Sequence, residues 1–220
     1  CGCLVALVAG AALLAQAPKK EPPVQWVETP SGRWMVHDEA RPAPPVVMPG
    51  VCGAQETPAK PPSDAVVLFD GKDLSNWTDM KGQPSKWLVG NGYMESVKGA
   101  GYIRTRQEFG SAQIHVEFAT PATVSGRGQG RGNSGVFVHG RYEVQVLDSY
   151  ENPTYPDGQC GALYGRAVPL VNASCKPGQW QTYDIIYHRP LFDQSGKVTR
   201  IAVFTVLHNG VLIHDHVALE

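Results

Sequence analysis

Alternating apolar and polar positions are clearest in residues 142–147 of this 220-residue chain. Successive side chains of a β-strand point to opposite faces of the sheet, so the alternation predicts a strand with one apolar and one polar face. The polar face carries Glu143 and Gln145, and Asp148 follows where the strand ends. The apolar face, which is expected to meet a hydrophobic core, carries Tyr142, Val144 and Val146.

The segment before this strand predicts the first strand of a β-hairpin. Residues 131–135 read Arg-Gly-Asn-Ser-Gly and lead into an apolar run. Glycine permits a sharp turn or the close approach of another group, because it has no side chain. We therefore expect a hairpin over residues 131–149 whose returning strand carries the reactive groups. An ordinary solvent-facing strand alternates in the same way and is the alternative.

The rest of the chain predicts short strands separated by turns. Asn91-Gly92 favours a tight hairpin turn because both residues tolerate positive φ. No segment has sustained helical periodicity. The expected strands are residues 65–69, 86–89, 93–97, 101–105, 112–120, 180–188, 198–207 and 211–216. This pattern predicts an all-β sandwich or jelly roll.

The first residues differ in composition from the rest. An apolar run ending in Ala-Gln-Ala is typical of a signal peptide, so residues 1–17 are expected to be the remaining part of one. The run is too short to span a bilayer comfortably, and no transmembrane segment is expected in the mature chain. We therefore expect an exported protein with a periplasmic, extracellular or cell-surface location. A buried core helix, an uncleaved anchor, or lipid on Cys1 or Cys3 are the alternatives.

Prolines dominate residues 18–62, which predicts an extended linker or arm. Its aromatic residues could pack on the following domain or belong to a mobile tail. Residues 63–220 are then expected to form the β-sandwich domain.

Charge and cysteines narrow the expectations further. The formal net charge is -1 and no basic stripe stands out, so nucleic acid is not an expected partner. In an exported chain, Cys160 and Cys175 are expected to form a disulfide, with two buried thiols as the alternative. Cys52 has no obvious partner. The lack of a Cys-x-x-Cys pair argues against a cysteine-bound zinc site.

Several motifs, in order, resemble the 3-keto-disaccharide hydrolase family. They are residues 68–77 (LFDGKDLSNW), 132–137 (GNSGVF), 140–149 (GRYEVQVLDS), 160–165 (CGALYG), 209–211 (NGV) and His214-Asp215. The resemblance implies a concanavalin A-like jelly roll of two antiparallel sheets. It also implies a carbohydrate substrate and a site in a concave face. Family members continue beyond the last matching strand, so the domain is expected to be incomplete at its C-terminus.

The activity that this family implies needs a base, a group that stabilises an enolate oxygen, and an acid. A ketone at C3 acidifies the hydrogen on C2, and the C1 substituent then leaves by elimination, with later hydration. The candidates for proton transfer are Glu143, Asp148 and His139. The candidates for substrate binding are Arg131, Asn133, Arg141, Gln145, Tyr164 and Trp180. A divalent cation could replace an arginine at the enolate oxygen.

The same residues also fit purely structural roles and two other functions. Arg141 could form a surface ion pair, His139 could be solvated at the hairpin turn, and Asp148 could cap a turn. Glu143-x-Gln145-x-x-Asp148 loosely resembles the catalytic strand of bacterial β-glucanases, but only a bulge would bring both carboxylates to one face. A lectin-like module that binds sugar without cleaving it is the third alternative.

Overall fold

The structure is a computed structural model that describes residues 24–29, 32–49 and 61–220. The chain divides into two compact units, residues 1–36 and residues 37–220. The described part of the first unit is an antiparallel hairpin of β1 (Trp26–Thr29) and β2 (Gly32–Met35). The expected signal peptide, residues 1–17, lies outside the described residues.

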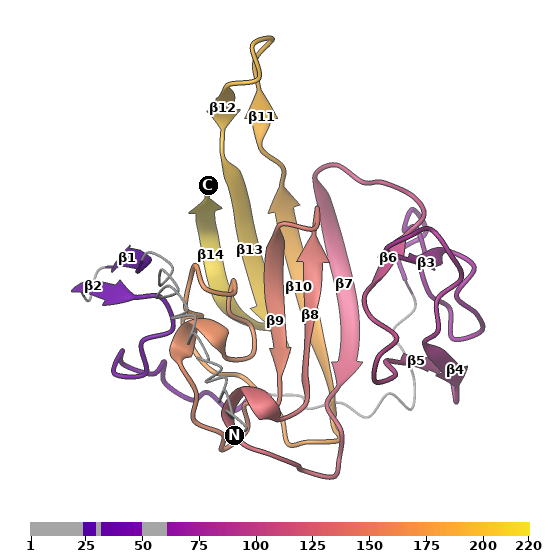
Figure 1. Ribbon diagram of the computed structural model, residues 1–220, viewed down its shortest axis with the longest axis horizontal. Coiled ribbons are helices and arrows are strands. Elements are labelled where there is room, and N and C mark those ends of the chain that lie inside the picture. Colours follow the sequence, from indigo (N-terminus) through magenta and orange to yellow (C-terminus); the bar gives the residue numbers. More distant parts are fainter. Residues whose placement is uncertain (1–23, 30–31, 50–60) are drawn as a thin grey trace, which may run out of the picture. The chain divides into compact units, whose positions relative to one another are not determined.

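The regular secondary structure of the second unit consists almost entirely of antiparallel strands, which loops connect (Figure 1). Its largest sheet has the order β14-β13-β10-β7, with β7 (Ala112–Ala119), β10 (Trp180–His188), β13 (Ala202–His208) and β14 (Val211–Leu219). The hairpin of β8 (Asn133–Val138) and β9 (Tyr142–Leu147) forms a second sheet. The smaller pairs are β3 (Trp77–Asp79) with β6 (Ile103–Thr105), β4 (Leu88–Gly90) with β5 (Tyr93–Glu95), and β11 (Leu191–Phe192) with β12 (Val198–Arg200). Two short 3-10 turns, η1 (Gly128–Gly130) and η2 (Pro156–Gly158), complete it.

The core lies between the four-stranded sheet and the β8–β9 hairpin, which crosses in front of that sheet in Figure 1. Strands β10 and β13 bury every second side chain, as a strand with one apolar face does. The ring of Phe204 on β13 contacts Tyr142 of β9 at 5.4 Å between centroids and Tyr187 of β10 at 4.8 Å. The predicted all-β sandwich of antiparallel sheets is confirmed.

The hairpin over β8 and β9 follows the sequence prediction. Its register runs without a shift from Asn133 opposite Leu147 to Val138 opposite Tyr142. The connecting turn contains His139 and Gly140 with φ of 54° and 62°. Because no bulge interrupts the register, Glu143 and Asp148 keep opposite strand parity.

The predicted strand over residues 65–69 is wrong. The Nδ2 of Asn76 donates to the carbonyl oxygens of Val67 and Leu68, at 3.4 and 3.3 Å. The Nε1 of Trp77 donates to the same Leu68 oxygen at 2.8 Å. Side chains therefore satisfy backbone acceptors that a neighbouring strand would otherwise bind. The other predicted strands overlap observed ones, although residues 198–207 divide into β12 and β13.

The predicted Cys160–Cys175 disulfide is also wrong. Cys160 is a free, buried thiol whose Sγ lies 3.0 Å from the hydroxyl of Tyr183. Burial raises the pKa of this thiol, which keeps it protonated and apolar in character. Cys175, in contrast, is disulfide-bonded.

Residues 37–49 of the proline-rich segment are described with the sandwich in the second unit. Val46 forms a parallel bridge with Asn172. The Asn172 N–H donates to the Pro45 oxygen at 2.9 Å, and the Val47 N–H donates to the Asn172 oxygen at 3.0 Å. Across the described ranges, no helix has the length and apolar content needed to span a membrane.

Two buried histidines predict an acid-sensitive fold. The Nε2–H of His208 donates to Gln181 Oε1 at 3.0 Å, and that of His214 donates to the Gly161 oxygen at 2.8 Å. Desolvation lowers the pKa of His208 from 6.5 to about 3 and that of His214 to about 4.

Below pH 6.5 the unfolded chain therefore binds protons that the folded chain excludes, and stability falls as the pH falls towards about 4. Each histidine contributes a slope of roughly 1.4 kcal/mol per pH unit in that window. Urea unfolding of the wild type and of His208→Asn and His214→Gln between neutral and acidic pH measures this contribution. Slopes that are identical in all three proteins would contradict it.

Candidate functional site

A row of three side chains crosses the outer face of the β8–β9 hairpin. Phe137 lies directly opposite Glu143 in the register of β8 and β9. On the other side of β9, Leu163 bridges to Val144, and the Tyr164 N–H donates to the Glu143 oxygen at 3.0 Å. Residues directly opposite one another share a face of the sheet, so Phe137, Glu143 and Tyr164 project to the same side. Glu143 stands in the middle of the row.

The carboxylate of Glu143 is half-buried and lies against Gly135, where an added Cβ would meet its Oε1 at 2.1 Å. Among the described residues no hydrogen-bond donor or cation pairs with this carboxylate. Desolvation raises the pKa of Glu143 above its ordinary value of 4.5. An unpaired carboxylate with a raised pKa is a stronger base than an exposed one, and such groups cluster at functional sites.

One flank of the row is a group of hydroxyls and an imidazole. The hydroxyls of Tyr155 and Tyr164 are 2.7 Å apart. The ring of His37 contacts both, at centroid distances of 4.4 Å from Tyr155 and 5.1 Å from Tyr164. Asp157, which is buried, accepts a hydrogen bond from the His37 N–H at 3.0 Å. This flank therefore supplies proton donors beside Glu143.

The other flank is an exposed aromatic pair, Phe137 and Tyr102, called here the aromatic platform. Their rings meet edge to face at 5.4 Å between centroids. Phe137 is 43% exposed and Tyr102 is 66% exposed. Exposed rings next to a polar group offer an apolar surface for the faces of a ligand ring.

Gln145, the next polar residue of β9, has a buried side chain that is not part of the row. Its Nε2 donates to Gln129 Oε1 at 3.1 Å and to the Gly158 oxygen at 3.2 Å. Asn133 donates to Gln129 Oε1 at 3.2 Å. The structure therefore joins Asn133 and Gln145 through Gln129, and Gln145 is only 1% exposed.

Arg131 and Asp148 form a mostly buried ion pair with each other. The Nε of Arg131 donates to Asp148 Oδ2 at 2.8 Å, and its Nη2 donates to the same oxygen. The carbonyl of Asp148 accepts from Asn152 Nδ2 at 2.6 Å. These contacts bind the end of β9 to the preceding loop, away from the row around Glu143.

The remaining predicted site residues lie elsewhere. His139 Nε2 is 3.0 Å from the Phe109 oxygen at the end of the hairpin, and Nδ1 is 3.4 Å from the Tyr187 hydroxyl. Arg141 is exposed over the ring of Tyr142. Trp180 contacts Tyr93 and alternates with the core-facing residues of β10, so it faces away from the core on the other sheet.

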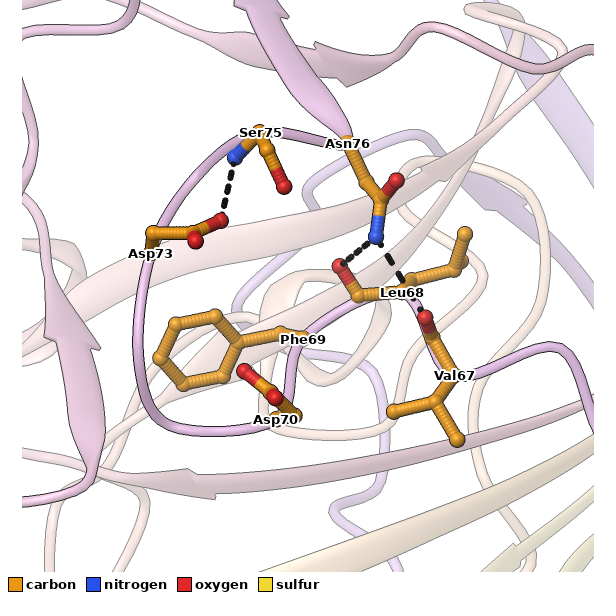
Figure 2. A pocket seen from close by; sticks show the side chains of 7 residues that line it. All are labelled: Val67, Leu68, Phe69, Asp70, Asp73, Ser75 and Asn76. Carbon is orange, nitrogen blue, oxygen red and sulfur yellow. Dashed lines mark hydrogen bonds between the residues drawn. The ribbon is translucent and has the colours of Figure 1, made fainter.

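A cavity of about 170 Å³ lies apart from the row, within residues 67–76 (Figure 2). Asp73 accepts from the Ser75 N–H at 2.8 Å, and Asp70 pairs with Lys72 at 2.6 Å. Hydrogen bonds from Lys72 lower the pKa of Asp70, and those from Ser75 lower the pKa of Asp73. These contacts are local turn interactions that shape the loop.

The described residues contain no recognisable metal site. Within residues 24–29, 32–49 and 61–220, no group of three or more His, Cys, Asp or Glu side chains is placed to hold a metal ion. In the described ranges, the structure therefore offers no ligand group for the divalent cation considered at the enolate oxygen.

Together, the fold and the row define an antiparallel β-sandwich domain with a carboxylate between two aromatic flanks. The chain belongs to the family of the 3-keto-alpha-glucoside-1,2-lyase-like domain, whose family model matches residues 64–220. This confirms the resemblance seen in the sequence motifs.

One solved structure is clearly similar to this chain. The chain is similar to the crystal structure of a "putative glycosyl hydrolase" from Parabacteroides distasonis, with 46% identity and a TM-score of 0.72. The match covers 81% of this chain and 75% of that chain. A second structure with the same description and source has 19% identity over 68% of this chain and 70% of that chain, with a TM-score of 0.49, and supports no inference. No curated protein matches the chain.

The sequence analysis did not predict four of the residues in the row and its flanks. They are Phe137, Tyr102, Tyr155 and His37. The position of Phe137 follows from turn length, because a three-residue turn after Val138 sets it opposite Glu143. His37 and Asp157 are 120 positions apart, and no local pattern pairs them.

Proposed function

We propose that this domain cleaves glycosides oxidised at C3, by elimination across C1 and C2, with Glu143 as the base. The family and the similar structure indicate an enzyme that cleaves glycosidic bonds. The observation that carries the finer proposal is the unpaired, half-buried carboxylate of Glu143, whose raised pKa suits proton abstraction. One carboxylate base is sufficient for the proton abstraction itself, because the ketone already acidifies the hydrogen on C2.

The reaction balances as follows. Glu143 takes the proton from C2, and the electron pair of that bond moves into the enolate of the C3 ketone. When the enolate collapses, C1 and C2 form a double bond and the bond from C1 to the glycosidic oxygen breaks. The departing oxygen takes a proton, and addition of water across C1 and C2 gives net hydrolysis.

The β-glucanase alternative finds less support in the geometry. A retaining displacement needs two carboxyl groups that flank one bond. Asp148 is paired with Arg131, and the register of the hairpin has no bulge that would turn Asp148 towards Glu143. That alternative required a bulge to bring both carboxylates to one face, and the β8–β9 register contains none.

The proposal is tested by comparing three substrates with the purified protein. We expect cleavage of a 3-keto-disaccharide and no cleavage of the parent disaccharide or of a β-glucan, because only the ketone acidifies C2. Equal cleavage of the parent disaccharide would overturn the elimination and favour an ordinary glycoside hydrolase. Binding of sugars without turnover would favour a lectin-like module.

The aromatic platform gives a separate prediction. Phe137→Ala and Tyr102→Ala are each expected to raise KM for the keto-disaccharide by about 3- to 10-fold, as expected for a ring contact worth about 0.5–1.5 kcal/mol. The value of kcat should change little, because stacking on a remote sugar ring is equal in the ground and transition states. Steady-state kinetics measure both values.

Phe192→Ala is the matched control, since Phe192 is also an exposed aromatic residue, at 56%, on the separate β11–β12 pair. A similar rise in KM for all three variants would remove the platform from the substrate site. Thermal unfolding should differ little among them because all three rings are exposed.

A further inference from the structure

His37 lies outside the matched family region of residues 64–220, yet it contacts the residues beside Glu143. Its N–H donates to Asp157 Oδ2 at 3.0 Å, and its Nδ1 lies 3.2 Å from Oδ1 of the same carboxylate. Asp157 is only 1% exposed. A buried carboxylate that binds both the backbone and the ring of one histidine fixes the direction of that ring.

The backbone of His37 supports a specific role for this contact. Its φ is 64°, in the left-handed region that non-glycine residues seldom adopt. Such conformations persist where surrounding contacts enforce them, and they cluster at functional sites. The second attachment of the segment, at Asn172, holds residues 37–49 against the domain.

The fixed ring packs on a pair of tyrosines. Its centroid lies 4.4 Å from the ring of Tyr155 and 5.1 Å from that of Tyr164. The two tyrosine hydroxyls are 2.7 Å apart, and Tyr164 stands opposite Glu143. The remaining proton-transfer candidates, Asp148 and His139, are bound to other partners.

We propose that the Tyr155–Tyr164 hydroxyl pair protonates the departing oxygen at C1, and that His37 is the positioning residue that holds this pair. This inference rests on the proposed function of the same site. The Tyr164 O–H gives its proton to the departing oxygen, and the Tyr155 O–H donates a hydrogen bond to the tyrosinate that forms. The proton that Glu143 took from C2 then returns to Tyr164 through solvent, which restores both groups.

The ionisation of Tyr155 agrees with this division of roles. Desolvation and the hydrogen bond with Tyr164 raise the pKa of Tyr155 well above its ordinary value. Tyr155 therefore stays protonated and can act as the donor within the pair.

The test compares two 3-keto-glucosides that differ only in the departing group. One releases a sugar, whose oxygen needs a proton, and the other releases 4-nitrophenolate, which leaves without one. Tyr164→Phe is expected to lose about 10²-fold in kcat on the sugar substrate, the usual scale for a lost acid group, and only a few-fold on the nitrophenyl substrate. Glu143→Gln should lose activity on both.

His37→Asn tests the positioning role. Asn tolerates a left-handed backbone and can keep the main-chain bond to Asp157, so this variant removes the ring alone. We expect about a 10-fold loss, within the usual range for a misplaced acid, on the sugar substrate alone. His216→Asn is the matched control, because His216 also has a positive φ, 50°, and an aspartate partner, Asp215.

The ratio of kcat for the two substrates decides the outcome, and it does not depend on the fraction of folded enzyme. Equal losses of Tyr164→Phe on both substrates would overturn the acid role. A wild-type ratio in His37→Asn would overturn the positioning role. A wild-type protein that turns over neither keto-substrate would overturn the proposed function itself, which is a different result from either of these.

Discussion

Glu143→Gln is expected to lower turnover of a 3-keto-glycoside by about 10²-fold or more, the usual scale for a lost acid–base group. Glutamine keeps the shape of the side chain and removes the titratable group. Steady-state kinetics on the keto-disaccharide measure the loss. Glu95→Gln, on the exposed edge of β5, is the matched control and should keep wild-type turnover.

The same variant should be as stable as the wild type or more stable. Burial raises the pKa of Glu143 above 4.5, so the folded state disfavours the charged form. This cost is absent below the ordinary pKa of 4.5, grows as the pH rises from there to the raised pKa, and is complete above it. Urea unfolding at neutral pH should therefore show no loss in Glu143→Gln. A clear destabilisation together with wild-type turnover would assign Glu143 a structural role.

Gly135→Ala disturbs the same carboxylate without removing it. The added Cβ would lie 2.1 Å from Glu143 Oε1, so the end of this flexible side chain must move. We expect turnover to fall while the fold is kept, because displacing a base from its working geometry is costly. Wild-type activity in Gly135→Ala would show that the observed carboxylate position is not the active one.

The largest expected loss of stability comes from breaking the ion pair of Arg131 and Asp148. Only 12% of the Arg131 side chain and 3% of the Asp148 side chain are exposed. Removing one partner of a buried pair leaves the other charge without compensation and costs about 3–5 kcal/mol. Arg131→Met and Asp148→Asn should each lower the free energy of unfolding by about 3 kcal/mol or more, as measured with urea.

Replacing both residues of the ion pair shows how much of the lost stability comes from the charge that a single replacement leaves unpaired. The double variant Arg131→Met with Asp148→Leu leaves no uncompensated charge, so it should be more stable than Arg131→Met alone. Losses below about 1 kcal/mol in both single variants would match an exposed pair and contradict this account.

Strand alternation in the sequence was sufficient to predict the hairpin that carries the site. The apolar face of β9 is buried as expected, and Glu143 projects to the opposite side from Val144. Residues 65–69 misled the prediction because their apolar composition resembles a strand. There, the side chains of Asn76 and Trp77 donate to the Leu68 oxygen, which a neighbouring strand would otherwise bind. Amino-acid composition does not reveal such side-chain donors.

The site was less predictable than the fold. Glu143 and Tyr164 were expected near a substrate and lie side by side, because residues 160–164 run along β9. His37 was hidden because its segment appears in the sequence as a proline-rich linker. Trp180 was predicted as a substrate-binding residue, but it lies on β10 of the four-stranded sheet, where strand parity turns its side chain away from the core.

The buried thiol of Cys160 has a practical consequence for observing motion in this domain. The sulfur lies in the core against Tyr183, and the backbone that follows it leads directly to Tyr164 along β9. A thiol reagent can reach this sulfur only when that segment separates from β9 or the two sheets part. The rate of Cys160 labelling under native conditions therefore measures how often this region opens. The same opening would separate Tyr164 from Glu143.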